Sequence, residues 1–250
     1  MLARSTATLI RRLQRELTTT VELREVSIIC ATKRAEFLTR IGESFNRQSY
    51  PYRRLILLLH GAEFDGITDE RIIDQLRVRD CTILRESDST LFGDCLNSAL
   101  DKVDAPYVTK FDDDDIYGEH HLSDLLVAHD YSSADIVGKW AHEVYFDNED
   151  FSIDWCLDRQ EDYVDHLPGA TILMRSELLK DLRFDSVPRA IDTHLFERLA
   201  KRNGRLYSTH RFNFTRVRHD DHTFHRDIEY FLKHSSNEIR EGYAEDSNRV

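Results

Sequence analysis

The sequence predicts an α/β fold with a mostly parallel central sheet flanked by helices. Strand-like and helix-like segments alternate from about residue 26 onward, and the strand-like segments are nearly continuous apolar runs. Such runs are typical of parallel strands that helices cover on both faces. The length of 250 residues suits one large domain, or one domain with a small appendage.

Four strands and three helices are expected in the first half of the chain. The runs "VSIICAT" (26–32) and "RLILLLH" (54–60) predict two strands, "CTILRES" predicts a weaker third, and "YVTKF" predicts a fourth. Between them, residues 37–45, 72–76 and 92–103 carry apolar side chains at helical spacing. This β-α-β-α-β-α-β order predicts an open sheet whose ligands bind outside the carboxyl ends of the strands.

The second half predicts a less regular order. "EHHLSDLLVAHD" and "DTHLFERLAKRNG" have the spacing of amphipathic helices, and "DIVGKWAHEVYF" alternates like a pair of strands. "GATILMRSELL" runs from a strand into a helix, and "RLYSTHRFNFTRVRH" is strand-like. Residues 236–250 are expected to form a polar tail that frays.

Composition excludes several classes of protein. Hydrophobic residues make up 40% of the chain, which indicates a globular protein. The formal charge of −12 argues against a general nucleic-acid binder, because phosphate backbones attract basic surfaces. The cysteines, Cys30, Cys81, Cys95 and Cys156, form no CxxC pair, and reduced thiols in a cytoplasmic protein are expected.

The first 23 residues need a separate interpretation. They place leucines at helical spacing with four arginines between them. Two interpretations of this segment stay open, a transit peptide and a helix on a membrane surface. The favoured interpretation is an amphipathic leading helix or linker. No run approaches the roughly 20 apolar residues of a spanning helix. Peripheral association with the inner face of a membrane therefore stays open as the alternative location.

Four consecutive aspartates, Asp112 to Asp115, follow the fourth predicted strand. If the strand geometry continues, Asp112 and Asp114 point to the same side. Two carboxylates on one side suit Mg²⁺ or Mn²⁺, which also bind substrate phosphates. The D-x-D-x-D-G pattern of a calcium loop is absent. The alternative is that one aspartate caps the next helix and the others are solvated. The position at a strand end favours the metal site.

These segments together resemble the nucleotide-binding half of family-two glycosyltransferases of the GT-A fold. The resemblance is carried by "VSIICATKR" (26–34), the turn "QSY" (48–50), the helix "GDCLNSA" (93–99) and "DDDD" (112–115). "PGATILMRSELL" and the "DTHLF" helix resemble the acceptor-side segment of that family. The resemblance covers roughly residues 24–220 and implies a Rossmann-like sheet with a small acceptor-side sub-region.

The resemblance implies a division of the chain and a set of site residues. Residues 24–118 would be the nucleotide-sugar and metal-binding half, and residues 119–235 the acceptor-binding half. Asp192 would be the catalytic base that takes the proton of the acceptor hydroxyl. The metal ligands would be Asp112, Asp114, His219 and His222. The nucleotide-sugar contacts would be Thr32, Arg34, His60, Asn97, Asp112, Asp113, Arg216 and Arg218.

The implied function is a metal-dependent inverting glycosyltransferase that uses Mn²⁺ or Mg²⁺. It would transfer a sugar from a nucleotide-diphosphate sugar, with UDP favoured, to a glycan or polyol-type acceptor in bacterial cell-surface polysaccharide or wall-polymer synthesis. The chain departs from the family where Leu59 and His60 replace an acidic pair that contacts the nucleotide. A non-catalytic GT-A-like binding module in a larger assembly therefore stays as the alternative. A nucleotidyltransferase is less favoured, because "CATKRAEF" lacks a glycine-rich phosphate loop. The sequence makes no prediction of oligomeric state.

Overall fold

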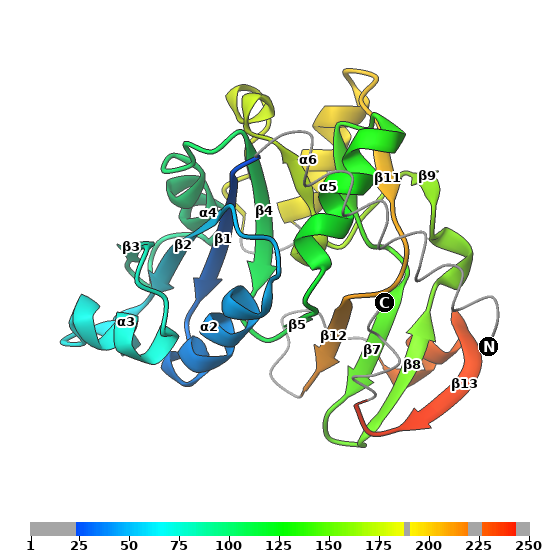
Figure 1. Ribbon diagram of the computed structural model, residues 1–250, viewed down its shortest axis with the longest axis horizontal. Helices are drawn as coiled ribbons and strands as arrows, with labels where there is room; N and C mark the ends of the chain where they lie inside the picture. Colours follow the sequence, from blue (N-terminus) through cyan, green and yellow to red (C-terminus); the bar gives the residue numbers. More distant parts are fainter. Residues whose placement is uncertain (1–23, 188–190, 220–226, 244–250) are drawn as a thin grey trace.

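The computed structural model describes residues 24–187, 191–219 and 227–243 (Figure 1). The expected N-terminal helix or linker (1–23) lies outside these ranges. The strands are β1 (Val26–Thr32), β2 (Arg53–His60), β3 (Cys81–Glu86), β4 (Tyr107–Asp112), β5 (Ile116–Tyr117), β6 (Ile136–Gly138), β7 (His142–Phe146), β8 (Phe151–Trp155), β9 (Asp162–Val164), β10 (Leu173–Arg175), β11 (Leu206–Ser208), β12 (Phe214–Arg218) and β13 (Ser235–Glu241). The helices are α2 (Leu38–Arg47), α3 (Asp69–Leu76), α4 (Phe92–Leu100), α5 (His121–Ser132), α6 (Ile191–Ala200) and α7 (Ile228–Leu232).

The strands form two sheets. The larger sheet has the order β3-β2-β1-β4-β10-β6-β11-β9, and the smaller one has the order β13-β8-β7-β12-β5. Strands β3, β2, β1 and β4 are all parallel, as the sequence predicts. Strand β10 is antiparallel to both of its neighbours, β4 and β6. The smaller sheet, at the lower right of Figure 1, combines antiparallel pairs with one parallel pair, β7 with β12.

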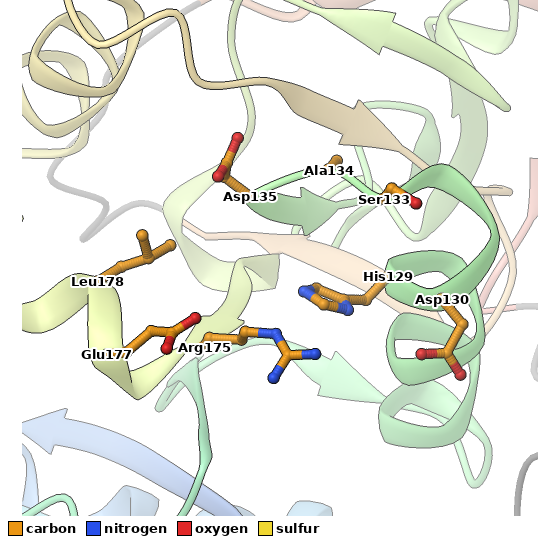
Figure 2. Close-up of a pocket in the computed structure, with 8 residues that line it drawn as sticks. All are labelled: His129, Asp130, Ser133, Ala134, Asp135, Arg175, Glu177 and Leu178. Carbon is orange, nitrogen blue, oxygen red and sulfur yellow. The ribbon is translucent and has the colours of Figure 1, made fainter.

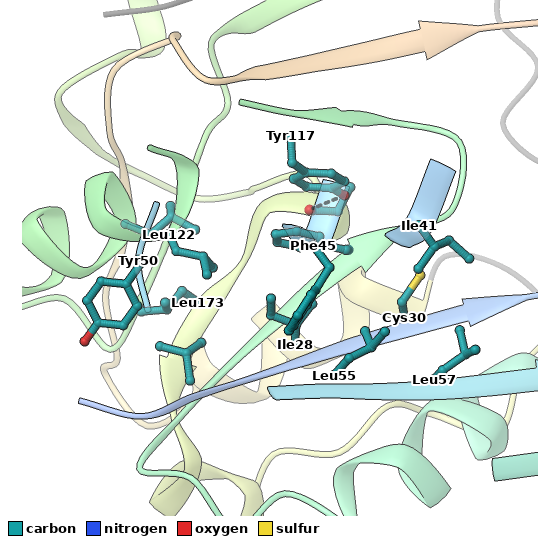
Figure 3. Close-up of a cluster of buried hydrophobic side chains, with 14 of the residues drawn as sticks. Ile28, Cys30, Ile41, Phe45, Tyr50, Leu55, Leu57, Tyr117, Leu122 and Leu173 are labelled. Carbon is teal, nitrogen blue, oxygen red and sulfur yellow. Dashed lines mark hydrogen bonds between the residues drawn. The ribbon is translucent and has the colours of Figure 1, made fainter. Parts of the chain in front are cut away.

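Helices cover both faces of the larger sheet, which explains its continuous apolar strands. Side chains from β1 and β2 that point to one face pack against α2, α3 and α5, and Figure 3 shows part of this cluster around Ile28, Leu55 and Phe45. The alternate residues of the same strands, such as Ile29 and Ile56, pack against α4 and α6. The predicted α/β fold, with a central sheet flanked by helices, is therefore confirmed.

Three expectations about the second half are wrong in detail. "DIVGKWAHEVYF" does form two strands, but β6 belongs to the larger sheet and β7 to the smaller one, so they do not pair with each other. The same division separates β11 from β12. Residues 235–241 form β13, which pairs with β8, so the expected polar tail does not begin at residue 236.

Two further sequence expectations concern the cysteines and membrane-spanning helices. All four cysteines are free, and three of them are buried, as expected for core thiols. None of the helices in the described ranges is long and apolar enough to span a membrane.

Candidate active site

One edge of the larger sheet gathers the polar residues of the site. The parallel strands β1 and β4 end there, and Ala31 pairs with Asp112. Strand β10 runs in the opposite direction, so the residues before it lie at the same edge. They form a single 3-10 turn, Gly169–Thr171. The carboxyl ends of parallel strands thus meet a turn from the second half of the chain, at the edge where open α/β sheets bind ligands.

The four aspartates leave β4 with unequal burial. Asp112 is the most accessible, with 37% of its side chain exposed, against 13% for Asp114 and 10% for Asp113, and Asp115 is buried. Of the pair that the sequence predicts to share one side, only Asp112 is clearly accessible. The strand itself ends at Asp112, so Asp114 is placed by the following bend.

Asp115 has a structural role. Its Oδ1 accepts a 3.0 Å hydrogen bond from the backbone N–H of Val217, which attaches the end of β4 to strand β12 of the smaller sheet. Burial, followed by the charges of Asp114 and Asp112, raises the pKa of the Asp115 carboxyl well above its ordinary value. Solvation of this aspartate, one of the sequence alternatives, is therefore wrong.

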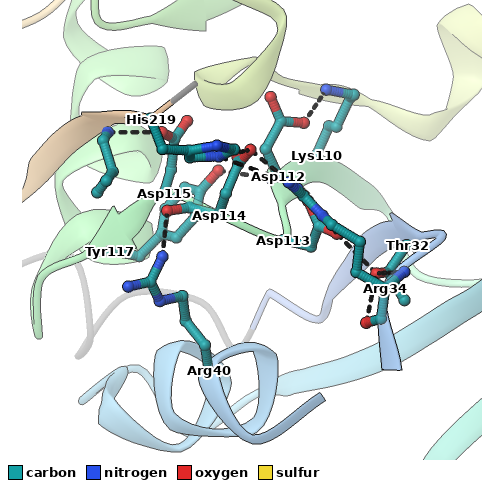
Figure 4. A network of polar contacts seen from close by, with 11 residues as sticks. Thr32, Arg34, Arg40, Lys110, Asp112, Asp113, Asp114, Asp115, Tyr117 and His219 are labelled. Carbon is teal, nitrogen blue, oxygen red and sulfur yellow. Dashed lines mark hydrogen bonds and ion pairs between the residues drawn. The ribbon is translucent and has the colours of Figure 1, made fainter. Parts of the chain in front are cut away.

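Arg34 is the counter-ion of two aspartates (Figure 4). Its Nη2 donates to Asp113 Oδ1 at 2.5 Å and to Asp114 Oδ2 at 2.9 Å, and its Nε donates to Asp113 Oδ2 at 3.2 Å. Thr32 Oγ1 donates a 2.6 Å bond to the same Asp113 oxygen. Burial alone would lower the pKa of Arg34, but hydrogen bonds to the two carboxylates and their charges raise it above its ordinary value. Thr32 and Arg34 therefore hold the aspartates in place.

His219 joins the same group from the smaller sheet. It follows the end of β12, and its Nε2 donates to Asp114 Oδ2 at 3.0 Å. Its ring stacks on Phe37, with the centroids 6.3 Å apart. Arg40 Nη1 donates to the backbone oxygen of Asp114 at 3.0 Å and fixes the bend from the other side. The second predicted histidine, His222, lies outside the described residues.

Lys110 is a buried cation beneath the aspartates. Its Nζ forms an ion pair with Asp112 Oδ1. Burial lowers the pKa of Lys110, but the charges of Asp112 and Asp192 outweigh that effect and raise it. The backbone N–H of Asp112 donates to Tyr117 Oη at 2.7 Å, and Tyr117 Oη donates to the backbone oxygen of Ala170 at 2.9 Å. Tyr117 therefore connects the aspartates with the Gly169–Thr171 turn.

Asp192 lies against that turn. It is in the first turn of α6, and its Oδ1 is buried without a hydrogen-bond partner in the described part of the chain. A Cβ at Gly169 would lie only 2.2 Å from Asp192 Oδ2, so the carboxylate lies directly over a glycine. Burial raises the pKa of Asp192; the charge of Lys110 lowers it, and the charge of Asp112 raises it again. The carboxyl group thus has a raised proton affinity and a free acceptor atom.

The two predicted arginines of β12 lie in different surroundings. Burial is the main influence on the pKa of both Asp192 and Asp115, and the charge of Arg216 lowers both values. Arg218 lies over the ring of Phe231, with its guanidinium carbon 5.2 Å from the ring centroid, and the charges of Asp115 and Asp114 act on it. Both arginines therefore interact electrostatically with carboxylates at the sheet edge.

Two predicted nucleotide contacts, Asn97 and His60, have side chains that are already bonded or buried. The Asn97 side chain donates to the backbone oxygen of Phe184 at 2.8 Å and accepts from its backbone nitrogen at 3.0 Å. This use of both amide atoms gives Asn97 a structural role in positioning the segment before α6, and its assignment as a nucleotide contact stays a prediction. The side chain of His60 is buried, and burial lowers its pKa. Asp88 lies beside Gly61 instead, and accepts a 3.0 Å bond from the backbone N–H of Ala62.

Sequence reasoning missed Lys110, Tyr117, Arg40 and Gly169. A signal for Lys110 was available, since residues two apart on a strand point to the same side, so Lys110 had to accompany Asp112. The contacts of Tyr117, Arg40 and Gly169 depend on how separate segments meet. No local pattern predicts them.

The donor set can be tested for a divalent cation. Within the described ranges, no group of three or more His, Cys, Asp or Glu side chains is arranged to hold a metal ion by itself. Magnesium and manganese sites that bind substrate phosphates often take only one or two protein carboxylates, and Mn²⁺ accepts imidazole nitrogen. Asp114 and His219, whose donor atoms lie 3.0 Å apart, offer such a partial set. These residues fit a cation whose remaining ligands come from a bound diphosphate and water.

A cavity of about 330 Å³ lies at the opposite end of β4 (Figure 2). It is lined by residues such as His129, Asp135 and Arg175. Arg175 pairs with Tyr107 at the start of β4, whereas Asp112 is at its end. The cavity is therefore separate from the carboxylate cluster.

Comparison with known proteins places the fold. No protein-family model and no curated protein sequence matches the chain. Among solved structures, TarS from S. aureus in complex with UDP-GlcNAc superposes with a TM-score of 0.61 and 18% identity, over 84% of this chain and 64% of that one. A longer TarS structure superposes with a TM-score of 0.60 and 17% identity, over 78% of this chain and 37% of that one. The mannosyltransferase PcManGT from Pyrobaculum calidifontis, in complex with GDP-Man and Mn²⁺, superposes with a TM-score of 0.59 and 14% identity. The match covers 86% of this chain and 65% of that one.

These similarities show the fold of the chain. It is the fold of nucleotide-sugar glycosyltransferases, as the resemblance in the sequence implies. The chain spans less than two thirds of the length of each of these structures.

Proposed function

We propose that this protein is a metal-dependent inverting glycosyltransferase, which moves a sugar from a nucleotide-diphosphate sugar to a hydroxyl acceptor. The observation that carries the proposal is the Asp192 carboxylate, buried, raised in pKa and with an unpartnered Oδ1 at the sheet edge. The fold supports it, since S. aureus TarS and PcManGT were solved with UDP-GlcNAc and with GDP-Man and Mn²⁺. As the resemblance implies, we place the reaction in bacterial cell-surface polysaccharide or wall-polymer synthesis, with a cytoplasmic donor.

The proposed reaction is a single displacement. The acceptor oxygen attacks the anomeric carbon on the face opposite the diphosphate, and the bond from that carbon to the diphosphate oxygen breaks. Its electron pair leaves with the diphosphate, and the acceptor proton passes to Asp192 Oδ1. A base whose pKa is raised toward the operating pH is more effective at taking a proton. The negative charge of Asp192 also requires a nearby cation, and Lys110 supplies one.

The departing diphosphate gains negative charge and needs cations. Arg216, near Asp192, and Arg34, at the aspartates, are the proposed contacts of the chain. Asp114 and His219 would hold the divalent cation, which would act as a Lewis acid toward the diphosphate. Thr32 and Asp113 keep Arg34 at the entrance to this site.

Binding and turnover test the proposal separately. A thermal-shift panel of nucleotide-sugars, each with and without Mn²⁺, should identify a donor that stabilises the folded protein, because a ligand that binds only the native state must raise the melting temperature. No stabilisation by any nucleotide would contradict the proposal and favour the non-catalytic binding module.

Two substitutions test the assigned residues with the selected donor. Asp192→Asn should lower kcat by about 10² to 10⁴-fold, the range typical of losing a general base. Asp114→Asn should abolish Mn²⁺-dependent turnover while the protein stays folded, although its ion pair with Arg34 is lost. Asp74→Asn on the exposed face of α3 is the matched control and should behave as wild type. Wild-type activity in Asp192→Asn or Asp114→Asn would refute the role of that residue.

A further inference from the structure

The segment after β6 reaches the same sheet edge as the aspartates. Strands β4 and β6 both pair antiparallel with β10, so they run in the same direction and their carboxyl ends lie together. Trp140 follows β6 by two residues. Its backbone N–H donates to Ser208 Oγ at 2.9 Å, and that of Lys139 donates to Thr171 Oγ1 at 2.9 Å. These bonds fix Trp140 beside the turn that contacts Asp192.

Three aromatic rings continue from Trp140 to the helix that carries Asp192. The His166 ring is 5.8 Å from the Trp140 ring at 79° and 5.4 Å from the Phe196 ring at 89°. Phe196 is four residues after Asp192 on α6, so both side chains lie on one face of the helix.

Packing accounts for only part of this arrangement. Phe196 is buried and belongs to the apolar core. Trp140 is only partly buried, and His166 is exposed. Arg159 borders the group, with its guanidinium carbon 5.3 Å from the centroid of the Trp140 ring. An accessible aromatic surface, a flanking N–H donor and an unpartnered carboxylate together have the composition of a ligand site.

We propose that Trp140 and His166, whose rings meet edge to face at 79°, form an angled platform against which a sugar ring of the acceptor packs, with one of its hydroxyls directed at Asp192. This inference rests on the proposed function. A pyranose ring has an apolar C–H face that packs on aromatic rings and hydroxyls that bond to Arg159 and Asp192. An acyclic polyol has no such face. The platform therefore makes the enzyme selective for cyclic sugar acceptors over linear polyols.

Acceptor kinetics test the platform with defined probes. Transfer from the donor chosen by thermal shift is measured to methyl pyranosides and, in parallel, to sorbitol. Trp140→Ala should lower kcat/KM for the pyranosides by about tenfold, equivalent to about 1.4 kcal/mol, mainly through KM. Transfer to sorbitol, hydrolysis of the donor by water and stabilisation by the nucleotide should change less than about twofold, a difference of about 0.4 kcal/mol.

Additional variants separate recognition from folding. His166→Ala removes an exposed side chain and should weaken pyranoside use in the same direction, even if Trp140→Ala lowers the melting temperature. Tyr52→Ala removes an exposed aromatic at the other end of the sheet and should leave acceptor preference unchanged. Absence of donor turnover in the wild type would overturn the proposed function and, with it, this inference. Donor turnover with an unchanged preference for pyranosides in both variants would overturn this inference alone.

Discussion

A methyl group at position 169 would push directly against the proposed base. The Cβ of Gly169→Ala would lie 2.2 Å from Asp192 Oδ2 and 2.3 Å from its Cγ, whereas ordinary contacts begin at 3.4 Å. The carboxylate or the turn must therefore move by about 1 Å, and a misplacement of about that size can cost about 10²-fold in rate. The backbone at Gly169 is not left-handed, so alanine adds no strain of its own there.

Turnover and stability should separate in this variant. We expect kcat for Gly169→Ala to fall by about 100-fold, equivalent to about 2.7 kcal/mol of activation free energy. The free energy of unfolding should fall by about 1–3 kcal/mol, as for other overpacked sites. Steady-state sugar transfer and urea denaturation measure the two quantities.

The control for this experiment is another glycine. Gly66→Ala meets nothing within 4 Å but has a φ of +77°, so it should destabilise the fold and leave kcat unchanged. The reasoning is refuted if Gly169→Ala retains kcat within twofold of the wild type, or if Gly66→Ala loses as much activity as Gly169→Ala.

Two further predictions concern stability. His121 and His142 are fully buried, and burial holds the pKa of each well below its ordinary value. These two histidines bind about two more protons in the unfolded chain below pH 6.5, so together they add up to about 2.7 kcal/mol per pH unit to the fall of the unfolding free energy with decreasing pH. His142→Phe should lower the measured slope by up to about 1.4 kcal/mol per unit in urea titrations between pH 7.5 and 5, and an unchanged slope would contradict the assignment. Asn97→Ala should cost about 1–3 kcal/mol, because it leaves the backbone of Phe184 without two hydrogen bonds. Asn97→Asp keeps the acceptor but sets a second carboxylate oxygen against the Phe184 backbone oxygen, so it should be destabilising as well, and wild-type stability of either variant would refute this explanation.

The sequence predicts the first half of the fold well because its signals are local. Strands β1, β2 and β4 are largely apolar runs, and β1 and β2 are each followed by a helix with a clear apolar face. The smaller sheet gives no such signal. Thr215 pairs with Glu143 across most of the second half of the chain, and such long-range pairing leaves no trace in local periodicity.

The same distinction applies to the site. The sequence places the aspartates at the end of a strand. The two-residue alternation of side chains along a strand is enough to place Lys110 on the same side as Asp112. The bidentate contact of Arg34 with Asp113 depends on the bend of two loops, and the contact of Asp192 with Gly169 depends on two turns. Spacing therefore predicts the residue types at the site, while three-dimensional packing decides their partners.

One group of contacts also determines which parts of the chain must fold together to form the site. It consists of Arg34, Asp113, Asp114 and His219. The nitrogens of Arg34 and His219 lie 3.5 Å apart although 185 residues separate them in sequence. Closing a loop of that length is entropically costly and is completed only when both sheets are in place. The two halves inferred from the sequence are thus not interchangeable modules. The first half supplies the carboxylates and most of their contacts, whereas the His219 imidazole is added by the segment after β12, so the complete contact group requires both halves.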